Sequence, residues 1–325
     1  MNSPWKTQNN KPLFILAPME AVTDTVFRHV IKEASSPDIF FTEFVSTDGY
    51  ASPNGRHSTK DRLEFTEDEQ PIIAQIWGNK PENFALMAKD LKKMGYAGID
   101  INMGCPDKAV VKQGSGSGLI HNHELSAEII KATKEGGLPV SVKTRLGNIR
   151  ADEWRPWIEH LLLQDLSNLT IHLRSRKEMS KVPAHFEIIP EIMKLRDKIA
   201  PQTLITINGD IKDYHHGMKL YKEYGVDGIM IGRGVFENPF AFSNRKDSPG
   251  KKELLDLFFL NLNLHDKYSR AERPRRFEPL KRFFKIYIRD FPDASALRHE
   301  LMQTKGTTEA RKLVEDFLKK EEAIK

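Results

Sequence analysis

The sequence of 325 residues contains a single cysteine, Cys105, and has no long apolar run. One thiol excludes an intrachain disulfide and any zinc or iron–sulfur site that is built from several cysteines. No uninterrupted apolar stretch approaches the roughly 18 residues that span a bilayer, so we expect no membrane association. The first eleven residues are polar and lack the apolar core of a secretory signal. These absences predict a cytoplasmic protein without a bound metal.

The net charge of +5 is distributed unevenly along the chain. Residues 245–325 hold 20 Lys and Arg against 14 Asp and Glu, a net charge of +6, so the rest of the chain carries −1. The densest part, residues 267–289, holds nine basic residues and two acidic ones. A basic segment on a nearly neutral protein indicates an anionic partner such as nucleic acid. From charge alone, a solvated helix face remains the alternative.

Short apolar segments alternate with helix-length segments over the first 240 residues. The apolar segments suit strands that are buried on both faces. They are residues 13–17, 39–44, 72–76, 98–101, 140–143, 169–172, 204–207 and 228–231. Helices are predicted between them, for example over 81–94 and 124–135, each followed by glycine. Eight strand–helix units predict an α/β fold of the (β/α)₈ TIM-barrel type, and an open doubly wound sheet is the alternative.

A polar segment, residues 244–252, contains Ser-Pro-Gly and is typical of a linker. It separates a predicted barrel domain, residues 1–243, from a predicted all-helical domain, residues 253–325. Within the helical domain an apolar stripe recurs at helical spacing, and we expect it to pack inward. The stripe consists of Leu280, Phe283, Phe284, Tyr287 and Ile288.

Three basic residues, Lys281, Lys285 and Arg289, recur at every fourth position opposite that stripe. This spacing predicts one basic helix face, and such a face can contact nucleic-acid phosphates.

The active site of a TIM barrel is built by the loops at the C-terminal ends of its strands. Polar residues or glycines follow seven of the eight predicted strands. They are Pro18-Met19-Glu20, Gln75, Asn102 with Cys105, Lys143 with Arg145, His172 with Arg174, Asn208-Gly209-Asp210 and Gly232-Arg233-Gly234. The glycines after the last two strands allow backbone N–H groups to approach an anion, and Arg233 adds a charged donor. This is the usual phosphate position in a TIM barrel, although two ordinary turns would show the same glycines.

Six segments together carry a family resemblance. They are LAPMEAVTD (16–24), DINMGCP (100–106), KQGSGSGLI (112–120), VKTRLG (142–147), NGDI (208–211) and IGRGVFENP (231–239). The sequence resembles the tRNA dihydrouridine synthases, which are flavin-dependent enzymes that reduce uridine in tRNA. The resemblance continues to the C-terminal end, where LKRFFKIYIRDFPDASALR (280–298) is similar to the helical RNA-binding domain of the family.

The resemblance implies FMN in the barrel mouth, NADPH or NADH as its reductant, and tRNA as the partner of a monomer. It places Pro18, Met19 and Glu20 against the isoalloxazine ring, with Gln75, Lys143 and His172 on the ring or the ribityl chain. It assigns the ribityl phosphate to Asn208, Gly209, Asp210, Gly232 and Arg233, and it makes Cys105 the proton donor. Glu20 departs from the family, which usually has alanine there, and is expected to put an extra carboxyl beside the flavin.

Uracil chemistry agrees with these roles. Its C5=C6 bond is conjugated to the C4 carbonyl, so a hydride from flavin N5 goes to C6 and leaves C5 in need of a proton. Cys105 can supply that proton as a general acid while it is a thiol, and an ordinary cysteine pKa of about 8.5 keeps it protonated at neutral pH. Lys143 near the flavin N1–O2 edge would favour the anionic reduced ring.

Three other functions remain open from the sequence. A flavin barrel acting on a small metabolite would explain the barrel residues but not the basic C-terminal segment. A non-catalytic RNA-binding protein would leave Cys105 and Lys143 without a role. The same chemistry on ribosomal RNA is the third alternative, and the sequence identifies neither the uridine nor the preferred nicotinamide cofactor.

Overall fold

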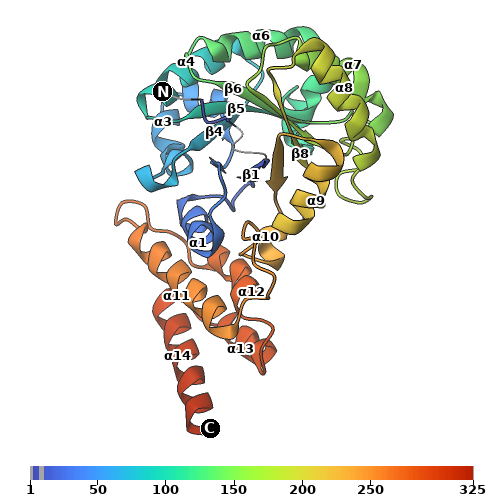
Figure 1. Ribbon diagram of the computed structural model, residues 1–325. Coiled ribbons are helices and arrows are strands. Elements are labelled where there is room, and N and C mark those ends of the chain that lie inside the picture. The colour runs from blue at the N-terminus through green and yellow to red at the C-terminus, as the bar shows by residue number, and fades with distance from the viewer. Residues whose placement is uncertain (1–2, 7–10, 325) are drawn as a thin grey trace. The chain divides into compact units, whose positions relative to one another are not determined.

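Nine parallel strands form one sheet in the computed structural model, which describes residues 3–6 and 11–324 (Figure 1). They are β1 (Leu13–Leu16), β2 (Phe40–Phe41), β3 (Val45–Ser46), β4 (Ile72–Trp77), β5 (Gly98–Met103), β6 (Val140–Arg145), β7 (Asn168–His172), β8 (Leu204–Asn208) and β9 (Gly228–Ile231). Hydrogen-bonded neighbours follow the order β1-β9-β8-β7-β6-β5-β4-β2, and β3 also pairs with β4. The Leu16 N–H donates to the Ile39 carbonyl at 3.2 Å, and Ile15 and Ile39 form a parallel bridge. The sheet therefore closes into the predicted (β/α)₈ TIM barrel and is not an open doubly wound sheet.

The second position of the barrel is divided between β2 and β3, whereas the sequence predicts one strand over residues 39–44. The Thr42 hydroxyl accepts the Gln75 N–H at 3.1 Å, while the Thr42 N–H donates to the Ile73 carbonyl at 3.0 Å. A side-chain oxygen thus replaces a backbone carbonyl and interrupts the ladder. Glu43 lies in the interruption, near the C-terminal ends of the strands.

Helices connect the strands of the barrel. They are α2 (Thr47–Ala51), α3 (Gly55–Ser58), α4 (Pro81–Lys93), α5 (Lys108–Lys112), α6 (His123–Lys134), α7 (Trp154–Leu162), α8 (Ile189–Ile199) and α9 (Tyr214–Tyr224). Of these, α4, α6, α7, α8 and α9 cover the outside of the sheet (Figure 1). Short 3₁₀ turns are η1 (Lys60–Leu63), η2 (Glu67–Glu69), η3 (Gly116–His121), η4 (Ala151–Glu153) and η5 (Phe186–Ile188). Proline occupies the first position of α4, and Asn122 caps α6 by accepting the Leu125 N–H at 3.1 Å. Both helices agree with the predicted ranges to within one residue at each end.

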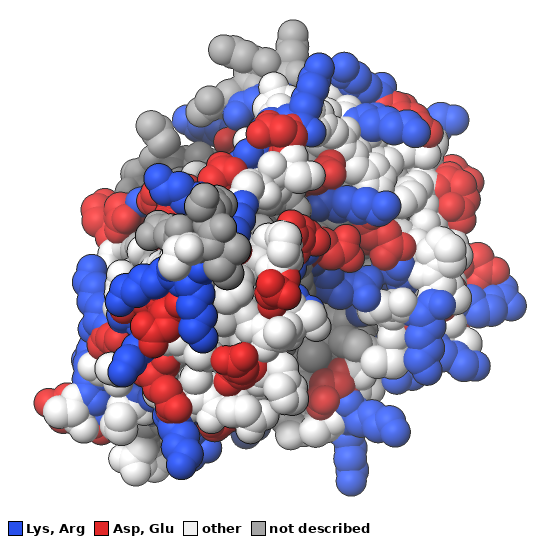
Figure 2. Space-filling view, turned by 90° about the horizontal axis from the view of Figure 1, so that it is seen from below, with Lys and Arg blue, Asp and Glu red and all other residues white. Residues whose placement is uncertain are grey.

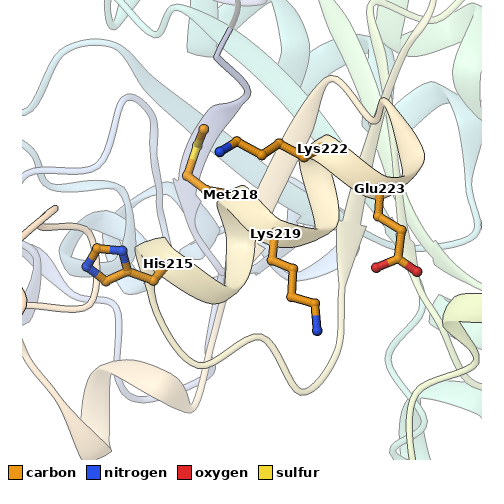
Figure 3. Close-up of a pocket in the computed structure, with 5 residues that line it drawn as sticks. All are labelled: His215, Met218, Lys219, Lys222 and Glu223. Carbon is orange, nitrogen blue, oxygen red and sulfur yellow. The ribbon is translucent and has the colours of Figure 1, made fainter.

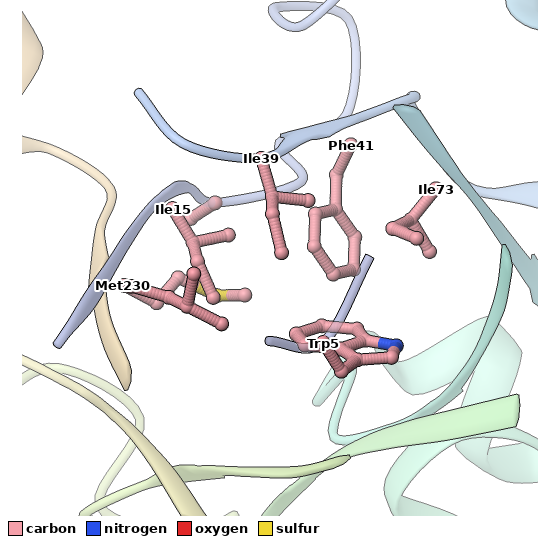
Figure 4. Close-up of a cluster of buried hydrophobic side chains, with 8 residues drawn as sticks. Trp5, Ile15, Ile39, Phe41, Ile73 and Met230 are labelled. Atoms are coloured by element: carbon pink, nitrogen blue, oxygen red, sulfur yellow. The ribbon is translucent and has the colours of Figure 1, made fainter. Parts of the chain in front are cut away.

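A cluster of buried side chains fills the N-terminal end of the barrel (Figure 4). Its labelled members are Trp5, Ile15, Ile39, Phe41, Ile73 and Met230. Trp5 comes from the segment before β1 and meets Phe41 edge-on, with ring centroids 6.3 Å apart. The apolar strand interiors and this tryptophan close one end of the barrel, so polar side chains are concentrated at the other end.

The chain divides into two compact units. The first comprises residues 1–25 and 37–234, and the second comprises residues 26–36 and 235–325. The remaining helices and turns are α1 (Thr25–Ser35), α10 (Gly234–Glu237), α11 (Lys251–Lys267), η6 (Glu278–Phe283), α12 (Phe284–Tyr287), α13 (Ala294–Leu301) and α14 (Thr307–Ile324). Within the described part of the chain, every helix is too short or too polar to cross a bilayer.

Helix α1 follows the first barrel strand in sequence but belongs to the second unit, apart from its first residue. Its Phe27 ring lies 6.0 Å from the ring of Phe236 and 5.2 Å from that of Phe283, measured between centroids. The second unit is therefore built from two separate parts of the chain. Helix α11 begins at Lys251, inside the segment predicted as a linker.

The predicted basic face of Lys281, Lys285 and Arg289 is wrong. Lys281 is buried, and its ammonium donates to the Glu278 carboxylate at 2.8 Å and to the Met302 carbonyl at 3.0 Å. Lys285 is exposed, but half-buried Arg289 follows the end of α12. The cause is the 3₁₀ turn η6, whose three residues per turn break the spacing that a continuous α-helix would keep.

The apolar stripe that the sequence predicts opposite that face is confirmed as core. All five of its members are buried: Leu280, Phe283, Phe284, Tyr287 and Ile288.

Candidate active site

The strand register brings the predicted polar residues together at the C-terminal end of the barrel. Gln75 on β4 is paired with Asp100 on β5, and Asp100 with Ser141 on β6. Beyond the next pair, Asn102 and Lys143, three strands end in register at Arg145, His172 and Asn208. Parallel strands place these side chains at one edge, as the fold requires of an active site.

A hydrogen-bond relay runs from the buried Asp100 carboxylate to the loop that carries Cys105. The Gln75 amide nitrogen donates to Asp100 at 2.7 Å, so its oxygen faces Asn102 and accepts the Asn102 amide at 3.0 Å. The Asn102 oxygen in turn accepts the backbone N–H groups of Gly104 and Cys105 at 3.1 and 2.9 Å. Because a carboxylate only accepts, Asp100 determines which way both amides are turned. The relay therefore sets the backbone position of Cys105.

The glycine-rich segment after α5 packs against the same loop. Gly116 has a positive φ of 56°, and a Cβ there would lie 3.0 Å from the Cys105 carbonyl oxygen. Ser117 donates to that carbonyl with its hydroxyl at 2.8 Å and its N–H at 3.1 Å. The positive φ and the short distance to the Cys105 carbonyl explain why glycine is needed at position 116.

Burial changes the pKa of two acidic groups on this side of the mouth. It raises the pKa of Asp100 to about 6, although the hydrogen bonds from Ser141 and Gln75 favour the carboxylate. Burial also raises the pKa of the Cys105 thiol, which is half-buried. The thiol therefore stays protonated at neutral pH, as a proton donor must.

Cations gather on the opposite side of the mouth. The Lys143 ammonium donates to the Asn208 amide oxygen at 3.0 Å, and Asn208 donates to the Met230 carbonyl at 2.9 Å. Burial and the neighbouring Arg145 lower the pKa of Lys143 to about 8. An ammonium held by a neutral amide beside another cation is suited to an anionic ligand.

Two arginines of this cationic side turn inward, which the sequence did not indicate. Arg145 is buried and donates to the Gly104 carbonyl at 2.8 Å and to two carbonyls of the loop after β7. Arg174 is 1% exposed and donates to the Val182 carbonyl at 2.6 Å and to Asp210. Each arginine therefore joins two loops of the barrel mouth by hydrogen bonds.

His172 accepts a hydrogen bond from Arg174, with 3.0 Å between His172 Nε2 and Arg174 Nη1. Since a guanidinium cannot accept, His172 must be neutral with its proton on Nδ1. Burial, with nearby Arg145 and Lys143, holds the pKa of His172 well below its usual value. The ring therefore offers one N–H donor and no charge.

The backbone of the loop after β8 lies close to the His172 ring. Gly209 has a φ of 121°, and a Cβ there would lie 3.1 Å from the His172 ring. The Asp210 carboxylate accepts from Arg174, from the Ala184 N–H at 3.0 Å and from Arg233 at 3.4 Å. An ionised carboxylate has no hydrogen to donate to a phosphate. The Asp210 side chain therefore orients Arg174 and Arg233 and does not contact the ligand itself.

Arg233 and Gly232 follow β9. The Arg233 side chain is 63% exposed, and a Cβ at Gly232 would meet only Ala17 and Met19 at ordinary contact distances of 3.6 and 4.0 Å. The space in front of Gly232 is therefore open to a ligand.

Pro18 and Met19 follow β1 and are half-buried, and Met19 donates its N–H to the Thr23 hydroxyl at 3.0 Å. Glu20 is exposed and forms two hydrogen bonds with Arg62, at 2.7 and 2.5 Å. The carboxyl that the sequence places beside the flavin is thus neutralised by a residue 42 positions away, a pairing with no signal in the sequence.

Arg62 also lies 3.8 Å from the carboxylate of buried Glu43. Burial, together with Asp24 and Glu20, raises the pKa of Glu43 to about 7. Sequence reasoning missed Glu43, because a single glutamate after a short apolar run has no distinguishing pattern.

A shallow pocket lies elsewhere, on the outer face of α9 (Figure 3). Its lining residues are His215, Met218, Lys219, Lys222 and Glu223. None of them is at a strand end, and none was predicted as a site residue. We therefore assign the chemistry to the barrel mouth.

Charge on the face drawn in Figure 2 is mixed, with Lys and Arg interspersed among Asp and Glu.

Among residues 3–6 and 11–324, no three His, Cys, Asp or Glu side chains are grouped to hold a metal ion.

Comparison with known proteins identifies the family. A family model described as dihydrouridine synthase (Dus) matches residues 15–322. The "probable tRNA-dihydrouridine synthase 2" of Bacillus subtilis (strain 168) is 59% identical over 310 residues, which cover 95% of each chain. The "probable tRNA-dihydrouridine synthase" of Staphylococcus aureus (strain COL) is 58% identical over 307 residues, or 94% of this chain and 93% of that protein.

A solved structure of 2-naphthoyl-CoA reductase with 2-naphthoyl-CoA is similar in fold alone. Its TM-score is 0.53 at 10% identity, and the match covers 72% of this chain and 49% of that one. The family match spans nearly the whole chain, and it includes the strand ends and the loop that holds Cys105. The chain therefore belongs to the dihydrouridine synthase family.

Proposed function

We propose that the protein is a tRNA dihydrouridine synthase that reduces the C5=C6 bond of specific uridines, using FMN and NADPH or NADH. The observation that carries the proposal is Cys105, a thiol held at the barrel mouth by Asn102 and kept protonated by burial. The names of relatives at 58–59% identity support tRNA as the substrate.

The donor set of the barrel mouth fits FMN. Lys143 has an amide and no carboxylate as its hydrogen-bond partner, and Arg233 is largely exposed beside open Gly232. Such cations suit a phosphate and a ring that becomes anionic on reduction. When bound, FMN supplies the hydride that its N5 gives to uracil C6.

The residues of the chain would divide the work as follows. The ring and the ribityl chain would lie against Pro18, Met19, Glu20, Gln75, Lys143 and His172. The phosphate would be held by Asn208, Gly209, Asp210, Gly232 and Arg233, where Asp210 acts through its backbone and by orienting arginines. Lys143 would favour negative charge on the ring, and Cys105 Sγ–H would deliver the proton to uracil C5.

The RNA contact is proposed on two parts of the chain. Residues 1–243 would bind FMN and the target uridine, and residues 253–325 would bind RNA, with residues 244–252 as the linker. Since Lys281 is buried, the exposed basic residues around it would make the phosphate contacts. We place the protein in the cytoplasm, where tRNA is modified, and expect it to act as a monomer.

Mass-spectrometric mapping of dihydrouridine tests this function. RNA from cells with and without the gene is compared, and purified protein is added to unmodified transcripts with FMN and NADPH. We expect yellow protein that releases FMN on denaturation, and dihydrouridine at defined tRNA positions that depend on the gene. Dihydrouridine missing only from ribosomal RNA, or protein that takes up no FMN, would contradict the proposal.

A further inference from the structure

Two exposed apolar side chains lie close to the barrel mouth. Ile149 and Met179 are 49% and 44% exposed. They follow β6 and β7 respectively, at the end of the barrel that carries Cys105. The other exposed large apolar side chains of the described part are Leu86, Met94, Leu163 and Met302, on the helices or at their C-terminal ends.

The two loops that carry Ile149 and Met179 are joined to each other; we call residues 146–150 the β6 loop and residues 173–182 the β7 loop. The Ser175 hydroxyl donates to the Ile149 carbonyl at 2.9 Å. Two N–H groups of the β7 loop, from Arg176 and Lys177, donate to carbonyls of the β6 loop at 2.8 and 2.9 Å. The apolar pair, Ile149 and Met179, is therefore displayed by one joined surface.

Arg145 connects this surface to the catalytic loop. Its guanidinium donates to the Met179 carbonyl at 3.0 Å and, through Nε, to the Gly104 carbonyl at 2.8 Å. Gly104 precedes Cys105 in the chain. One guanidinium therefore spans the distance between the β7 loop and the loop that carries Cys105.

Met179 occupies an unfavourable backbone conformation. Its φ is 53°, in the left-handed region that favours glycine, yet the residue carries a long apolar side chain to the surface. Backbone strain of this kind commonly marks a functional position. Replacement by glycine would relieve the strain while removing the side chain.

Unpaired positive charge surrounds the apolar pair. Among the described residues, exposed Lys177 and Lys181 have no ion-pair partner, and half-buried Arg176 donates through Nε to the Asn148 amide oxygen and has no carboxylate partner. The one acidic residue of the β7 loop, Glu178, is already bonded to the Ser175 N–H at 2.7 Å and to His185 at 3.0 Å. The surface therefore combines exposed apolar atoms with free cations.

We propose that Ile149 and Met179 contact the bases of the nucleotides that flank the reduced uridine, while Arg176, Lys177 and Lys181 contact their phosphates. The proposal rests on the proposed function, because it takes RNA as the substrate. A uridine that enters the barrel mouth leaves its stack and exposes the faces of the neighbouring bases. Apolar side chains inserted at such a step cover those faces.

RNA fits this surface better than a protein partner does. A stable protein interface buries roughly 800 Å² on each partner, far more than two side chains provide. The two free lysines, and the guanidinium of Arg176 that lacks a carboxylate partner, match phosphates, which contribute affinity that does not depend on sequence.

The apolar part is tested with the double variant Ile149→Ser/Met179→Gly and the control Leu163→Ser, which removes a more exposed apolar side chain (66%) at the C-terminal end of α7. We expect kcat/KM for reduction of an unmodified tRNA transcript to fall about tenfold to hundredfold, because each side chain loses burial against a base. FMN content, NADPH oxidation and the salt dependence of tRNA binding should match wild type. The control should match wild type in every measurement.

The charged part is tested with Lys177→Gln/Lys181→Gln and the control Lys219→Gln/Lys222→Gln on α9. The slope of log affinity against log salt should become shallower by about 0.7–0.9 for each phosphate that the variant no longer neutralises. The α9 control should leave that slope unchanged.

The outcomes separate this proposal from the proposed function. If wild-type protein forms dihydrouridine and the apolar double variant does so at the same rate, the surface proposal is overturned and the function stands. If the variant loses FMN, the loops belong to the flavin site, and a changed oligomeric state with normal RNA kinetics marks a protein contact; both results overturn the proposal. If no dihydrouridine forms but fluorescence anisotropy shows weaker tRNA binding by the double variant, the surface contacts RNA, while the proposed function and the placement beside a reduced uridine both fail.

Discussion

The two sides of the barrel mouth differ in the charge of their buried side chains and in the hydrogen-bond partners of those side chains. On the β4–β5 side, the Asp100 carboxylate is surrounded by neutral donors that pass its orientation to Cys105. On the β6–β9 side, Lys143 is held by an amide oxygen and Arg145 by carbonyls, and only Arg174 is bonded to a carboxylate. Burial acts on both sides: it raises the pKa of Asp100 to about 6 and lowers that of Lys143 to about 8.

The difference indicates which side has all the partners of its buried charges in the isolated chain. A buried carboxylate with its acceptors filled needs nothing further, and it fixes geometry. Lys143 and Arg145 lie together without a carboxylate partner, so their charged forms remain destabilised until an anion binds. The first side therefore positions a proton donor, and the second awaits a negatively charged ligand.

The largest expected effect comes from removing the proton donor of the first side. Cys105→Ala should slow dihydrouridine formation by about 10²–10⁴-fold, the usual contribution of general acid catalysis. FMN content and flavin reduction by NADPH should persist, because the cationic side is unchanged. Stopped-flow absorbance measures flavin reduction, and mass spectrometry measures dihydrouridine.

The pH profile of wild-type protein is the control for this prediction. Since burial raises the thiol pKa, dihydrouridine formation should stay constant through neutral pH and fall only at alkaline pH. An alanine variant that reduces tRNA at the wild-type rate would exclude Cys105 as the donor.

Asp100→Asn tests whether the relay carries an ionised carboxylate. The folded protein holds the Asp100 proton more tightly than the unfolded chain does, since its pKa rises from 3.8 to about 6. Rising pH between about 4 and 6 therefore removes about 3 kcal/mol of stability through this group. Asparagine keeps an acceptor for Gln75 and does not titrate, so the variant should gain that amount relative to wild type between pH 4 and pH 7.

Urea unfolding at pH 4, 5, 6 and 7 measures the difference, with exposed Asp256→Asn as the control. Parallel stability curves for Asp100→Asn and wild type would show that Asp100 does not titrate in this range.

Arg233→Ala weakens the second side. Loss of one charge-assisted hydrogen bond should reduce FMN affinity by about 1.5–3 kcal/mol, or about 10- to 150-fold. Lys219→Ala removes the same charge from the outer face of α9 and should leave FMN affinity unchanged. Equilibrium dialysis gives both values, and equal losses in the two variants would point to net charge instead of a phosphate contact.

The sequence predicts the barrel and its strand ends because buried strands and terminal polar residues have local patterns. Partners distant in sequence leave no such pattern, which is why Arg62 was not connected with Glu20. Arginine is usually exposed, so the inward turn of Arg145 and Arg174 was not foreseen. Lys281 was misplaced because the spacing assumed an α-helix where a 3₁₀ turn forms.

Glu20→Gln should have the smallest effect, and its sign should depend on pH. The Glu20–Arg62 pair is 44% and 38% exposed, so its loss costs at most about 1 kcal/mol.

Glu20→Gln also acts on buried Glu43, whose pKa is about 7. The substitution removes a negative charge that raises this pKa, and it leaves Arg62 free to neutralise the Glu43 carboxylate. A lower pKa for Glu43 recovers stability as pH rises toward 8, because its ionised form then costs less in the folded protein. The deficit measured by urea unfolding should therefore be smaller at pH 8 than at pH 5. Asp152→Asn removes an exposed partner of Arg150 and should show the same small deficit at both pH values. A deficit for Glu20→Gln that grows with pH would mean that Glu20 does not act through Arg62 and Glu43.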